Sequence, residues 1–532
     1  MSMTPIPLRE FATIVDPEHD NVAVAIKAVP AGTQILLPGG SIIQITAAIR
    51  PGHRFATRAL PNGTWVRQYG QPFARSRGLR PGDPITGETV QSETPAVDAL
   101  ATQYHPSPLS PWEGPIPTFQ GFVRANGLTG VRNWVLIVPV SMCAVHEAGQ
   151  IALQAEVTGI YSRTRYPNVD GVTALRHTGG CGCPYAKDGE LTPGAYTATL
   201  RMLAQHIRHP NVGAALMIEL GCEKTNFAAF KAAFGDADLT TRFGKPVARL
   251  TIQACGGTQA TIKKGLTILP ELLTAANETE RQPAPLSALA LGVECGGSDA
   301  FSGITANPAL GFASDLLIST GGRTLIGEVP EFWGAVHLFT QRAASRDVAE
   351  QILATIEAYR AYAARAGHDL AENPSPGNRE GGLLNITIKS LGALAKSGHA
   401  PVQGVLPYSG WVWDRPEAGV YLVNTPGYDQ LSVPGLVGAG AQIVCFTTGC
   451  GTGIGNAIAP VIKVSSNTPL YERMRDDIDI NAGAILSNGV PLEEMGRHIL
   501  DLIIRVASGE YTHAEKNGHR EFALWNVEGI WL

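Results

Sequence analysis

Three cysteines stand in glycine-rich loops that directly follow apolar, strand-like segments: Cys181, Cys222 and Cys295. In open α/β sheets ligands bind at the carboxyl ends of the strands, so thiols placed there could meet at one point. Thiolates suit iron, iron–sulfur clusters and zinc. Three protein ligands would leave one coordination position open for a substrate. The pattern therefore predicts a metal site, with three separate buried thiols as the alternative.

Three further residues could move protons. His177 precedes Cys181 in the same loop and could act as a base or a metal ligand, although a lone histidine is also a common structural group. Glu223 directly follows Cys222 and could carry a proton, or could be a solvated carboxylate. His19 flanks a strand-like segment near the N-terminus and could reach a neighbouring domain, or could be a surface residue. We expect His177 to be the base, with His19 as the second choice.

A further glycine-rich loop, residues 447–456 (TTGCGTGIGN), follows a strand-like segment. Its backbone N–H groups could hold a carboxylate. The loop also resembles a weak dinucleotide motif, which leaves a nucleotide-dependent oxidoreductase as an alternative, but no suitably placed acidic residue ends a following strand. Lys463 lies downstream and could add positive charge, or could be a solvated lysine.

The totals restrict the class of protein. A chain of 532 residues with 44% hydrophobic and 16% charged residues is globular and long enough for about three domains. The net charge of −5 and the lack of a Lys/Arg-rich run predict no nucleic-acid partner. Apolar runs are only strand-length, so we expect no membrane span. The N-terminus has no apolar signal core, which predicts a cytoplasmic protein with reduced cysteines.

The order of the segments predicts three domains. Residues 1–95 contain short strand-like runs separated by turn signals, which indicates a small β domain. Residues 96–118 are proline-rich and form a predicted linker. Residues 119–280 alternate buried strands with helical periods, which is typical of an α/β domain with a parallel sheet. Residues 281–532 repeat this pattern, with a long helix predicted over 346–366.

Several long strings, in order along nearly the whole chain, resemble the altronate/galactarate dehydratase family of hydro-lyases. Residues 19–25 (HDNVAVA) and 52–56 (GHRFA) resemble its N-terminal SAF-type domain, and residues 124–133 resemble the start of its second domain. The strings most specific to the family are 294–308 (ECGGSDAFSGITANP), 372–378 (ENPSPGN) and 478–483 (IDINAG).

The resemblance implies a fold, a cofactor and a set of site residues. The fold is multidomain α/β, with an N-terminal β-clip domain, a middle α/β domain and a C-terminal Rossmann-like domain, assembled as a homodimer. Iron is the implied cofactor, either as a ferrous ion or as an iron–sulfur cluster. The family's glycine-cysteine positions fall on Cys181, Cys222 and Cys295. Other family motifs contain the residues that we expect to bind substrate: Arg132, Asn133, Asp299, Ser302 and Lys463.

The implied substrate is a sugar acid. Residues 328–335 (EVPEFWGA) are closer to the altronate branch than to the galactarate branch, so we expect dehydration of D-altronate to 2-keto-3-deoxy-D-gluconate. Both branches usually have arginine where this chain has Cys450, and Cys183 is an extra cysteine. Galactarate dehydration, or elimination by a sulfolactate-type lyase, is therefore an alternative on the same scaffold. A sugar-acid or metal-binding protein without catalysis is the alternative of another class.

The expected reaction is β-elimination. A base takes the proton next to the carboxylate, and the metal, as a Lewis acid, stabilises the developing charge and assists departure of hydroxide. Arg132 and Lys463 would hold the carboxylates of the substrate. The predicted catalytic residues for the proton transfers are His177, His19 and Glu223.

Overall fold

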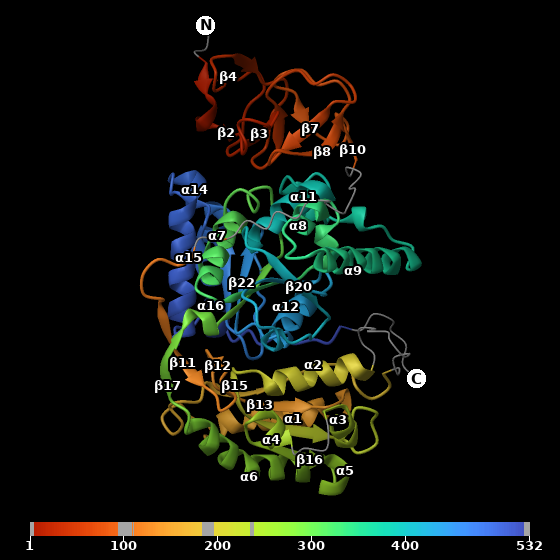
Figure 1. Ribbon diagram of the computed structural model, residues 1–532, viewed down its shortest axis with the longest axis vertical. Helices are drawn as coiled ribbons and strands as arrows, with labels where there is room; N and C mark the ends of the chain where they lie inside the picture. The colour runs from red at the N-terminus through yellow and green to blue at the C-terminus, as the bar shows by residue number, and fades with distance from the viewer. Residues whose placement is uncertain (1–4, 94–108, 110, 184–195, 235–238, 526–532) are drawn as a thin grey trace.

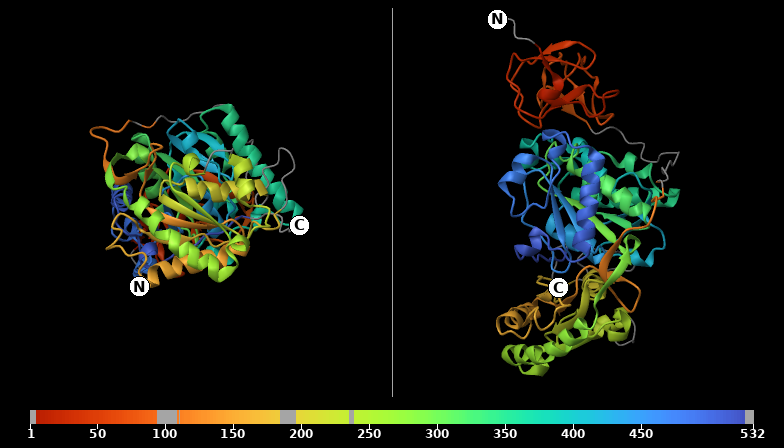
Figure 2. Two further views of the ribbon diagram at one scale, coloured as in Figure 1. Left: turned by 90° about the horizontal axis from the view of Figure 1, so that it is seen from below. Right: turned by 90° about the vertical axis from the view of Figure 1, so that its left-hand side faces the viewer.

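The computed structural model describes residues 5–93, 109, 111–183, 196–234 and 239–525. Three units follow one another along its longest axis (Figure 1). We call them the N-terminal unit (residues 5–93), the middle unit (111–280) and the C-terminal unit (281–525). The C-terminal unit lies between the other two, so the N-terminal and middle units are on its opposite sides (Figures 1 and 2).

The N-terminal unit is a small β structure built from short strands. The strands form three sheets, in the orders β1-β4-β5, β2-β3-β6-β9 and β10-β8-β7. Turns rich in proline and glycine stop each strand after a few residues. The strands are β1 Ile6–Pro7, β2 Ala12–Thr13, β3 Val22–Ala25, β4 Gln34–Leu36, β5 Ile42–Gln44, β6 Arg54–Ala56, β7 Trp65–Gln68, β8 Gln71–Ser76, β9 Pro84–Ile85 and β10 Val90–Ser92. The small β domain predicted at the N-terminus is confirmed.

The middle unit is a four-stranded parallel sheet in the order β14-β13-β15-β16. Its two central strands are buried along their whole length, because helices α1 and α6 pack on one face and α2 and α3 on the other. The strands are β13 Trp134–Pro139, β14 Gly171–Ala174, β15 Val212–Glu219 and β16 Val247–Thr251. The helices are α1 Val145–Val157, α2 Tyr196–Arg208, α3 Phe227–Phe234, α4 Leu239–Phe243, α5 Ile252–Cys255 and α6 Thr258–Asn277.

The C-terminal unit is built around seven parallel strands in the order β20-β21-β19-β18-β22-β23-β24. The strands are β18 Ala290–Cys295, β19 Arg323–Ile326, β20 Val402–Leu406, β21 Gly419–Val423, β22 Ile443–Thr448, β23 Val461–Ser465 and β24 Ile480–Asn481. The order reverses at β18, because β19 lies on one side of it and β22 on the other. A crevice for ligands forms at the carboxyl ends of strands where such a reversal occurs.

Helices cover both faces of this large sheet. Helices α7 and α15 pack on one face and α12 packs on the other. The helices are α7 Ala306–Ser319, α8 Val336–Thr340, α9 Arg346–Arg365, α10 Pro376–Glu380, α11 Ile386–Leu394, α12 Asp429–Gly438, α13 Thr468–Arg473, α14 Ala484–Ser487, α15 Leu492–Ala507 and α16 His513–Lys516. The long helix predicted over 346–366 is confirmed as α9. In the described part of the chain, no helix is long and apolar enough to span a membrane.

A small antiparallel sheet, β12-β11-β17, joins the middle and C-terminal units. The chain enters the middle unit through β11 (Thr118–Val123) and β12 (Thr129–Gly130), and leaves it through β17 (Arg281–Pro285). Both crossings therefore lie side by side. Most of the predicted linker, residues 96–118, lies outside the described residues. The molecule is a multidomain α/β protein, as predicted, with a large parallel sheet in its C-terminal region.

Candidate active site

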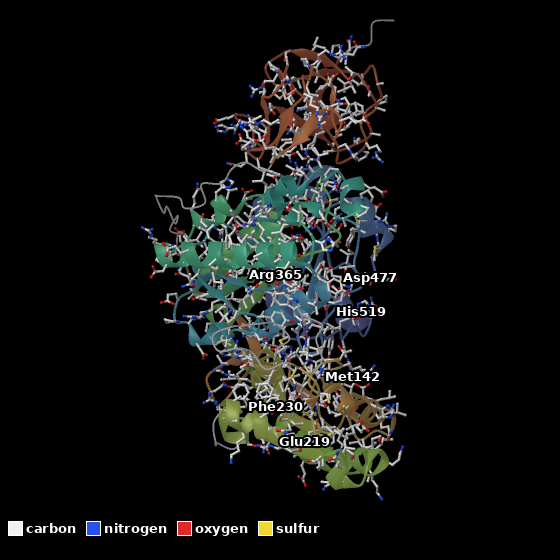
Figure 3. The ribbon with its side chains drawn as sticks, turned by 90° about the vertical axis from the view of Figure 1, so that its right-hand side faces the viewer. Met142, Glu219, Phe230, Arg365, Asp477 and His519 are labelled. Carbon is white, nitrogen blue, oxygen red and sulfur yellow. The ribbon has the colours of Figure 1, made fainter. Side chains whose placement is uncertain are left out.

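Three thiols lie together on the surface of the middle unit, those of Cys143, Cys181 and Cys222. Each follows one of three adjacent parallel strands, β13, β14 and β15, so all three stand at the same edge of the sheet. The three residues are exposed, and the thiols of Cys181 and Cys143 are hydrogen-bonded. Desolvation, and then the neighbouring thiols, raise the pKa of Cys181. We call these three residues the thiol cluster; Met142, which precedes Cys143, is labelled in Figure 3.

The buried carboxylate of Glu223 shapes the loop that carries Cys222. It accepts backbone N–H bonds from Leu220 at 2.7 Å, from Gly221 at 2.6 Å and from Cys222 at 3.0 Å. The hydroxyl of Ser141, beyond the end of β13, donates a fourth bond at 3.0 Å. Burial alone would raise the pKa of this carboxyl, but the hydrogen bonds lower it. Glu223 therefore ties two cysteine loops together and is a positioning residue rather than a free proton carrier.

His177 has a similar role in the loop that carries Cys181. Its Nε2 lies 2.7 Å from the carbonyl of Pro139, and its Nδ1 accepts a bond from the N–H of Gly179 at 3.2 Å. Burial lowers the pKa of His177 to about 4, so the imidazole is neutral near pH 7. Because both ring nitrogens are used within the fold, His177 is not placed to act as the base that the sequence predicted.

Cys295 stands apart from the thiol cluster, because β18 belongs to a different sheet. It is buried in the C-terminal unit, where its thiol donates to Glu331 Oε2 at 3.3 Å and accepts from Lys396 Nζ at 2.9 Å. It lines a pocket with Tyr69 of the N-terminal unit, on the side of the C-terminal unit opposite the middle unit (Figure 1). The structure therefore unites only two of the three thiols predicted to share a metal, and Cys143 takes the third place.

Around Cys295 lies a set of buried or mostly buried ionisable side chains, which we call the charged cluster: Glu294, Cys295, Glu328, Glu331, Lys389, Lys396 and Asp429. Lys389 pairs with Glu331 at 2.6 Å, and Lys396 pairs with Glu328. Burial, and then repulsion from a neighbouring carboxylate, raises the pKa of Glu294 and of Glu328. The same causes raise the pKa of Asp429 to about 7. The two ammonium groups supply positive charge inside the cluster, as buried thiols and carboxylates require.

A pocket lies between the N-terminal unit and the carboxyl end of β18. We call it the interface pocket; its polar lining includes Tyr69, Cys295, Ser298, Asp299, Ser302 and Lys389. The hydroxyl of Ser298 is buried and has no hydrogen-bond partner among the described residues. Leaving a buried hydroxyl unbonded costs about 1–3 kcal/mol, so this group is suited to a bound polar ligand.

The N-terminal unit contributes Tyr69 and Arg54 to this region. Tyr69 has a left-handed φ of 58°, and its hydroxyl lies only 2.5 Å from where a Cβ at Gly303 would stand, so that position needs glycine. Burial raises the pKa of Tyr69 to about 12, so the phenol keeps its proton. Arg54 is buried and donates to the carbonyl of Gly382, while its Nη2 has no partner in the part of the chain described here. Two units thus bring buried donors to one place.

Two of the predicted substrate-binding residues, Asp299 and Ser302, line the interface pocket. The carboxylate of Asp299 accepts bonds from the N–H and hydroxyl of Ser302 at 2.8 and 2.9 Å. It also accepts from the hydroxyl of Ser466 at 2.7 Å and the amide of Asn467 at 3.0 Å. Burial raises the pKa of Asp299. With its oxygens occupied, Asp299 fixes the shape of the pocket wall.

Arg132 and Asn133, also predicted to bind substrate, are structural. Arg132 is buried and makes two bonds to the carboxylate of Glu515, at 2.7 and 2.8 Å, and a third to the carbonyl of Val506 at 2.8 Å. The amide of Asn133 donates to the carbonyl of Ala276 at 2.8 Å. These bonds attach the start of β13 to α15, α16 and the end of α6, and leave Arg132 no free edge for a substrate carboxylate.

Lys463 and the glycine-rich loop before it do not form the expected anion site. Lys463 is buried on β23, outside the lining of the interface pocket, and its Nζ has no partner among the described residues. In the loop, the N–H groups of Gly449 and Cys450 both donate to the carbonyl of Gly297, at 3.0 and 2.8 Å. The loop therefore uses these donors to close against the segment that follows β18.

His19 is the predicted catalytic residue that remains accessible. Its side chain is 62% exposed, and its Nδ1 lies 2.9 Å from Asp16 Oδ2. A Cβ built at Gly70 would lie 3.8 Å from the Cβ of His19, so the imidazole is close to the turn that follows Tyr69. Among the predicted proton carriers, His19 is therefore the one beside the interface pocket.

Four important residues were not singled out from the sequence. Cys143 also follows a buried strand, but the string Ser-Met-Cys lacks the flanking glycine that drew attention to the other thiols. Arg54 lies inside a family string, where its histidine neighbour attracted the interpretation. Tyr69 and Lys396 carried no signal, because a strand-end tyrosine and a single lysine are common in any fold.

The comparisons with known proteins agree along nearly the whole chain. Residues 12–92 match the altronate/galactarate dehydratase SAF domain, and residues 121–277 match the second domain of D-galactarate dehydratase/altronate hydrolase. Residues 286–529 match the C-terminal domain of D-galactarate/altronate dehydratase. The chain belongs to the altronate/galactarate dehydratase family, and it has the family's N-terminal SAF domain.

Three relatives illustrate the range of this family. An altronate dehydratase of Bacillus subtilis is 36% identical over 96% of this chain and 97% of its own length. A galactarate dehydratase (L-threo-forming) of Escherichia coli is 34% identical over 96% of this chain and 95% of its own length. A (2R)-sulfolactate sulfo-lyase subunit beta of Chromohalobacter salexigens is 33% identical over 76% of this chain and 97% of its own length.

Proposed function

We propose that the chain is a hydro-lyase that removes water from a sugar acid, with D-altronate as the substrate and 2-keto-3-deoxy-D-gluconate as the product. The observation that carries this proposal is the 36% identity to an altronate dehydratase over 96% of the chain. The relatives named galactarate dehydratase and sulfolactate sulfo-lyase are similar at 34% and 33% identity, so their substrates are the alternatives that an assay must separate.

We place the sugar acid in the interface pocket. The pocket stands at the carboxyl end of β18, where the order of the parallel sheet reverses. Its unpaired buried groups, Arg54 Nη2 and Ser298 Oγ, are complementary to the carboxylate and hydroxyl groups of a sugar acid. Lys389 lines the same pocket and adds a cation. A sugar acid bound there would satisfy donors that the protein leaves free.

In a β-elimination, a base takes the proton from the carbon next to the carboxylate while hydroxide leaves the neighbouring carbon. Arg54 and Lys389 would hold the carboxylate as negative charge develops on it. His19, oriented by Asp16, is our choice for the base, because its imidazole is exposed beside the pocket. Tyr69 keeps its proton and would donate it to the leaving hydroxyl, which departs as water. The enol product then tautomerises to the 2-keto acid.

Iron is the cofactor that the resemblance implies, and two donor sets bear on it. Cys295, Glu328 and Glu331 each offer a donor atom within 4.8 Å of the others, but Lys396 and Lys389 already pair with them. The thiol cluster offers three exposed soft ligands and fits iron better. Iron bound to thiolates with one open position supplies Lewis-acid stabilisation to a ligand that reaches it.

We further infer three domains, at residues 1–95, 119–280 and 281–532, with a β-clip architecture in the first. The last would be a Rossmann-like domain, because its parallel strands are wound in both directions from β18. It differs from the usual order in that β21, and not β20, pairs with β19. The homodimer remains a prediction, which light scattering on the purified protein tests.

The experiment is a parallel assay of D-altronate, galactarate and (2R)-sulfolactate with ferrous iron under reducing conditions. Mass spectrometry identifies the 2-keto acid, and sulfite release reports the sulfo-lyase reaction. We expect the highest kcat/KM with D-altronate. Turnover of galactarate or sulfolactate alone would replace altronate as the substrate, and no turnover of any of the three would reject the hydro-lyase proposal.

A further inference from the structure

The thiol cluster is an unusual surface feature because its three thiols share no cation. The groups that raise the pKa of Cys181 through their charge are all acidic: Cys143, Cys222 and Glu223. Cys295, in contrast, has the ammonium of Lys396 against its sulfur at 2.9 Å. Thiols gathered without a counter-charge repel one another once ionised, and a bound cation relieves that repulsion.

The loops that carry the three thiols are held in place from below. His177 fixes the turn before Cys181, and Gly180 there has a φ of +102° with no room for a side chain, because a Cβ would lie 2.5 Å from the carbonyl of Val140. Glu223 fixes the loop of Cys222 through three backbone N–H groups. The thiols are therefore exposed while their backbone is rigid, as a preformed ligand site requires.

From this geometry we propose that Cys143, Cys181 and Cys222 bind an iron–sulfur cluster through three thiolates, at a site separate from the interface pocket. Among the described residues, these sulfurs do not form a set in which every donor lies within 4.8 Å of the others. One tetrahedral ion with metal–sulfur bonds of about 2.3 Å brings its sulfurs to about 3.8 Å. A cluster binds each thiolate at a different iron and accepts the wider spacing.

A disulfide accounts for the same residues less well. The thiols of Cys143 and Cys181 are hydrogen-bonded, but a disulfide between them would leave Cys222 without a role. Cys183 is not a fourth ligand, because it is buried and its thiol donates to the carbonyl of Gly180 at 3.3 Å. Three protein ligands leave one iron of a cluster open to solvent or to a small ligand.

The cluster site and the interface pocket are on opposite sides of the C-terminal unit (Figures 1 and 2). In Figure 3, Met142, next to Cys143, and Glu219, at the end of β15, both lie in the middle unit, far from the N-terminal unit that supplies Tyr69. The cluster proposal does not depend on the proposed dehydration, because iron binding is measured without substrate.

The test is the iron and acid-labile sulfide content of the full-length protein purified without oxygen. We expect both elements, with the broad visible absorption of a cluster, and loss of both in Cys143→Ser, Cys181→Ser and Cys222→Ser. Cys183→Ser and Cys255→Ser are the matched controls from the same unit and should keep both elements. Circular dichroism confirms that each variant is folded. Iron without sulfide, no iron, or a Cys143–Cys181 disulfide would each overturn the cluster.

A second measurement tests whether the two sites are separate. Electron paramagnetic resonance of the reduced protein, with and without D-altronate, should give the same g values if the substrate binds elsewhere. A shift of the signal on addition of D-altronate would overturn the separation, because it places the sugar acid on the cluster. Absence of dehydratase turnover with a full complement of iron and sulfide would reject the proposed function and leave the cluster intact.

Discussion

The thiol cluster and the charged cluster begin from the same local pattern and reach opposite chemistry. Cys181, Cys222 and Cys295 each follow a buried parallel strand and stand in a glycine-rich loop. In the middle unit the thiols are exposed and meet only acidic neighbours. In the C-terminal unit Cys295 is buried between Lys396 and Glu331. The comparison shows that the neighbours delivered by tertiary packing, and not the strand-end position, decide whether a thiol is free to bind a metal.

The largest effect that we predict comes from removing the internal cation of the charged cluster. Lys396→Met leaves Cys295 and Glu328 buried without their partner, so the free energy of unfolding should fall by about 3–5 kcal/mol. Urea unfolding measures this loss. Arg505→Met, which breaks an exposed pair with Glu510, is the control and should cost less than about 1 kcal/mol.

The same measurement on iron-free Cys143→Ser sharpens the comparison. Because Cys143 is exposed, its substitution should change the free energy of unfolding by no more than about 0.5 kcal/mol. A large loss in Cys143→Ser together with none in Lys396→Met would invert the roles that we assign to the two regions.

A second prediction concerns the interface pocket. Tyr69→Phe removes the phenol proton and keeps the ring, so kcat with the preferred sugar acid should fall by about 100-fold while the iron content stays unchanged. Steady-state kinetics and iron analysis on the same sample measure both quantities. Tyr428→Phe, at an exposed tyrosine, is the matched control. Normal turnover in Tyr69→Phe would remove Tyr69 from the mechanism.

A third prediction addresses the support beneath the thiol cluster. Glu223→Gln replaces a carboxylate that accepts three backbone N–H bonds, which should lower the free energy of unfolding by about 1–3 kcal/mol. Iron should also dissociate faster to a chelator, with KM for the sugar acid unchanged. Glu271→Gln, on the exposed face of α6, is the control. An altered KM with normal iron retention would show that Glu223 acts on substrate instead.

The smallest predicted effect is a difference in the pH dependence of stability. Burial lowers the pKa of His206, in the middle unit, to about 4, below the value of about 6.5 in an unfolded chain. Its contribution is complete above pH 6.5 and is lost towards pH 4, by at most about 1.4 kcal/mol per pH unit. Asp429 has the opposite sign: its pKa is raised to about 7, so its contribution is complete below about pH 4 and is lost as the pH rises towards 7.

Urea unfolding between pH 4.5 and 7.5 checks these two signs. His206→Gln should reduce the loss of stability on acidification, and Asp429→Asn should reduce the loss as the pH rises. If the two variants change the pH profile in the same direction, the assignment of opposite protonation states to these residues is wrong.

Much of the architecture could be predicted because it follows from local patterns. The apolar run at Trp134 forms β13, and the helical period after Ser345 forms α9, whose side-chain cap is Ser345 itself. Asp299 and Ser302 were predicted near the substrate and do line the interface pocket. The same reasoning misjudged His177, whose burial and two backbone partners depend on how β13 and β14 pack side by side.

The sequence by itself determined the strands, the turns, the family and the presence of thiols at strand ends, because these depend on neighbouring residues and on the periods of helix and strand. Only the tertiary structure decided which thiols meet and which charges are already paired. Arg132 binds Glu515, and Lys396 binds Cys295, across long separations in the chain. Such contacts are set when whole elements pack, and packing is what turns a reactive residue type into either a ligand or a structural bond.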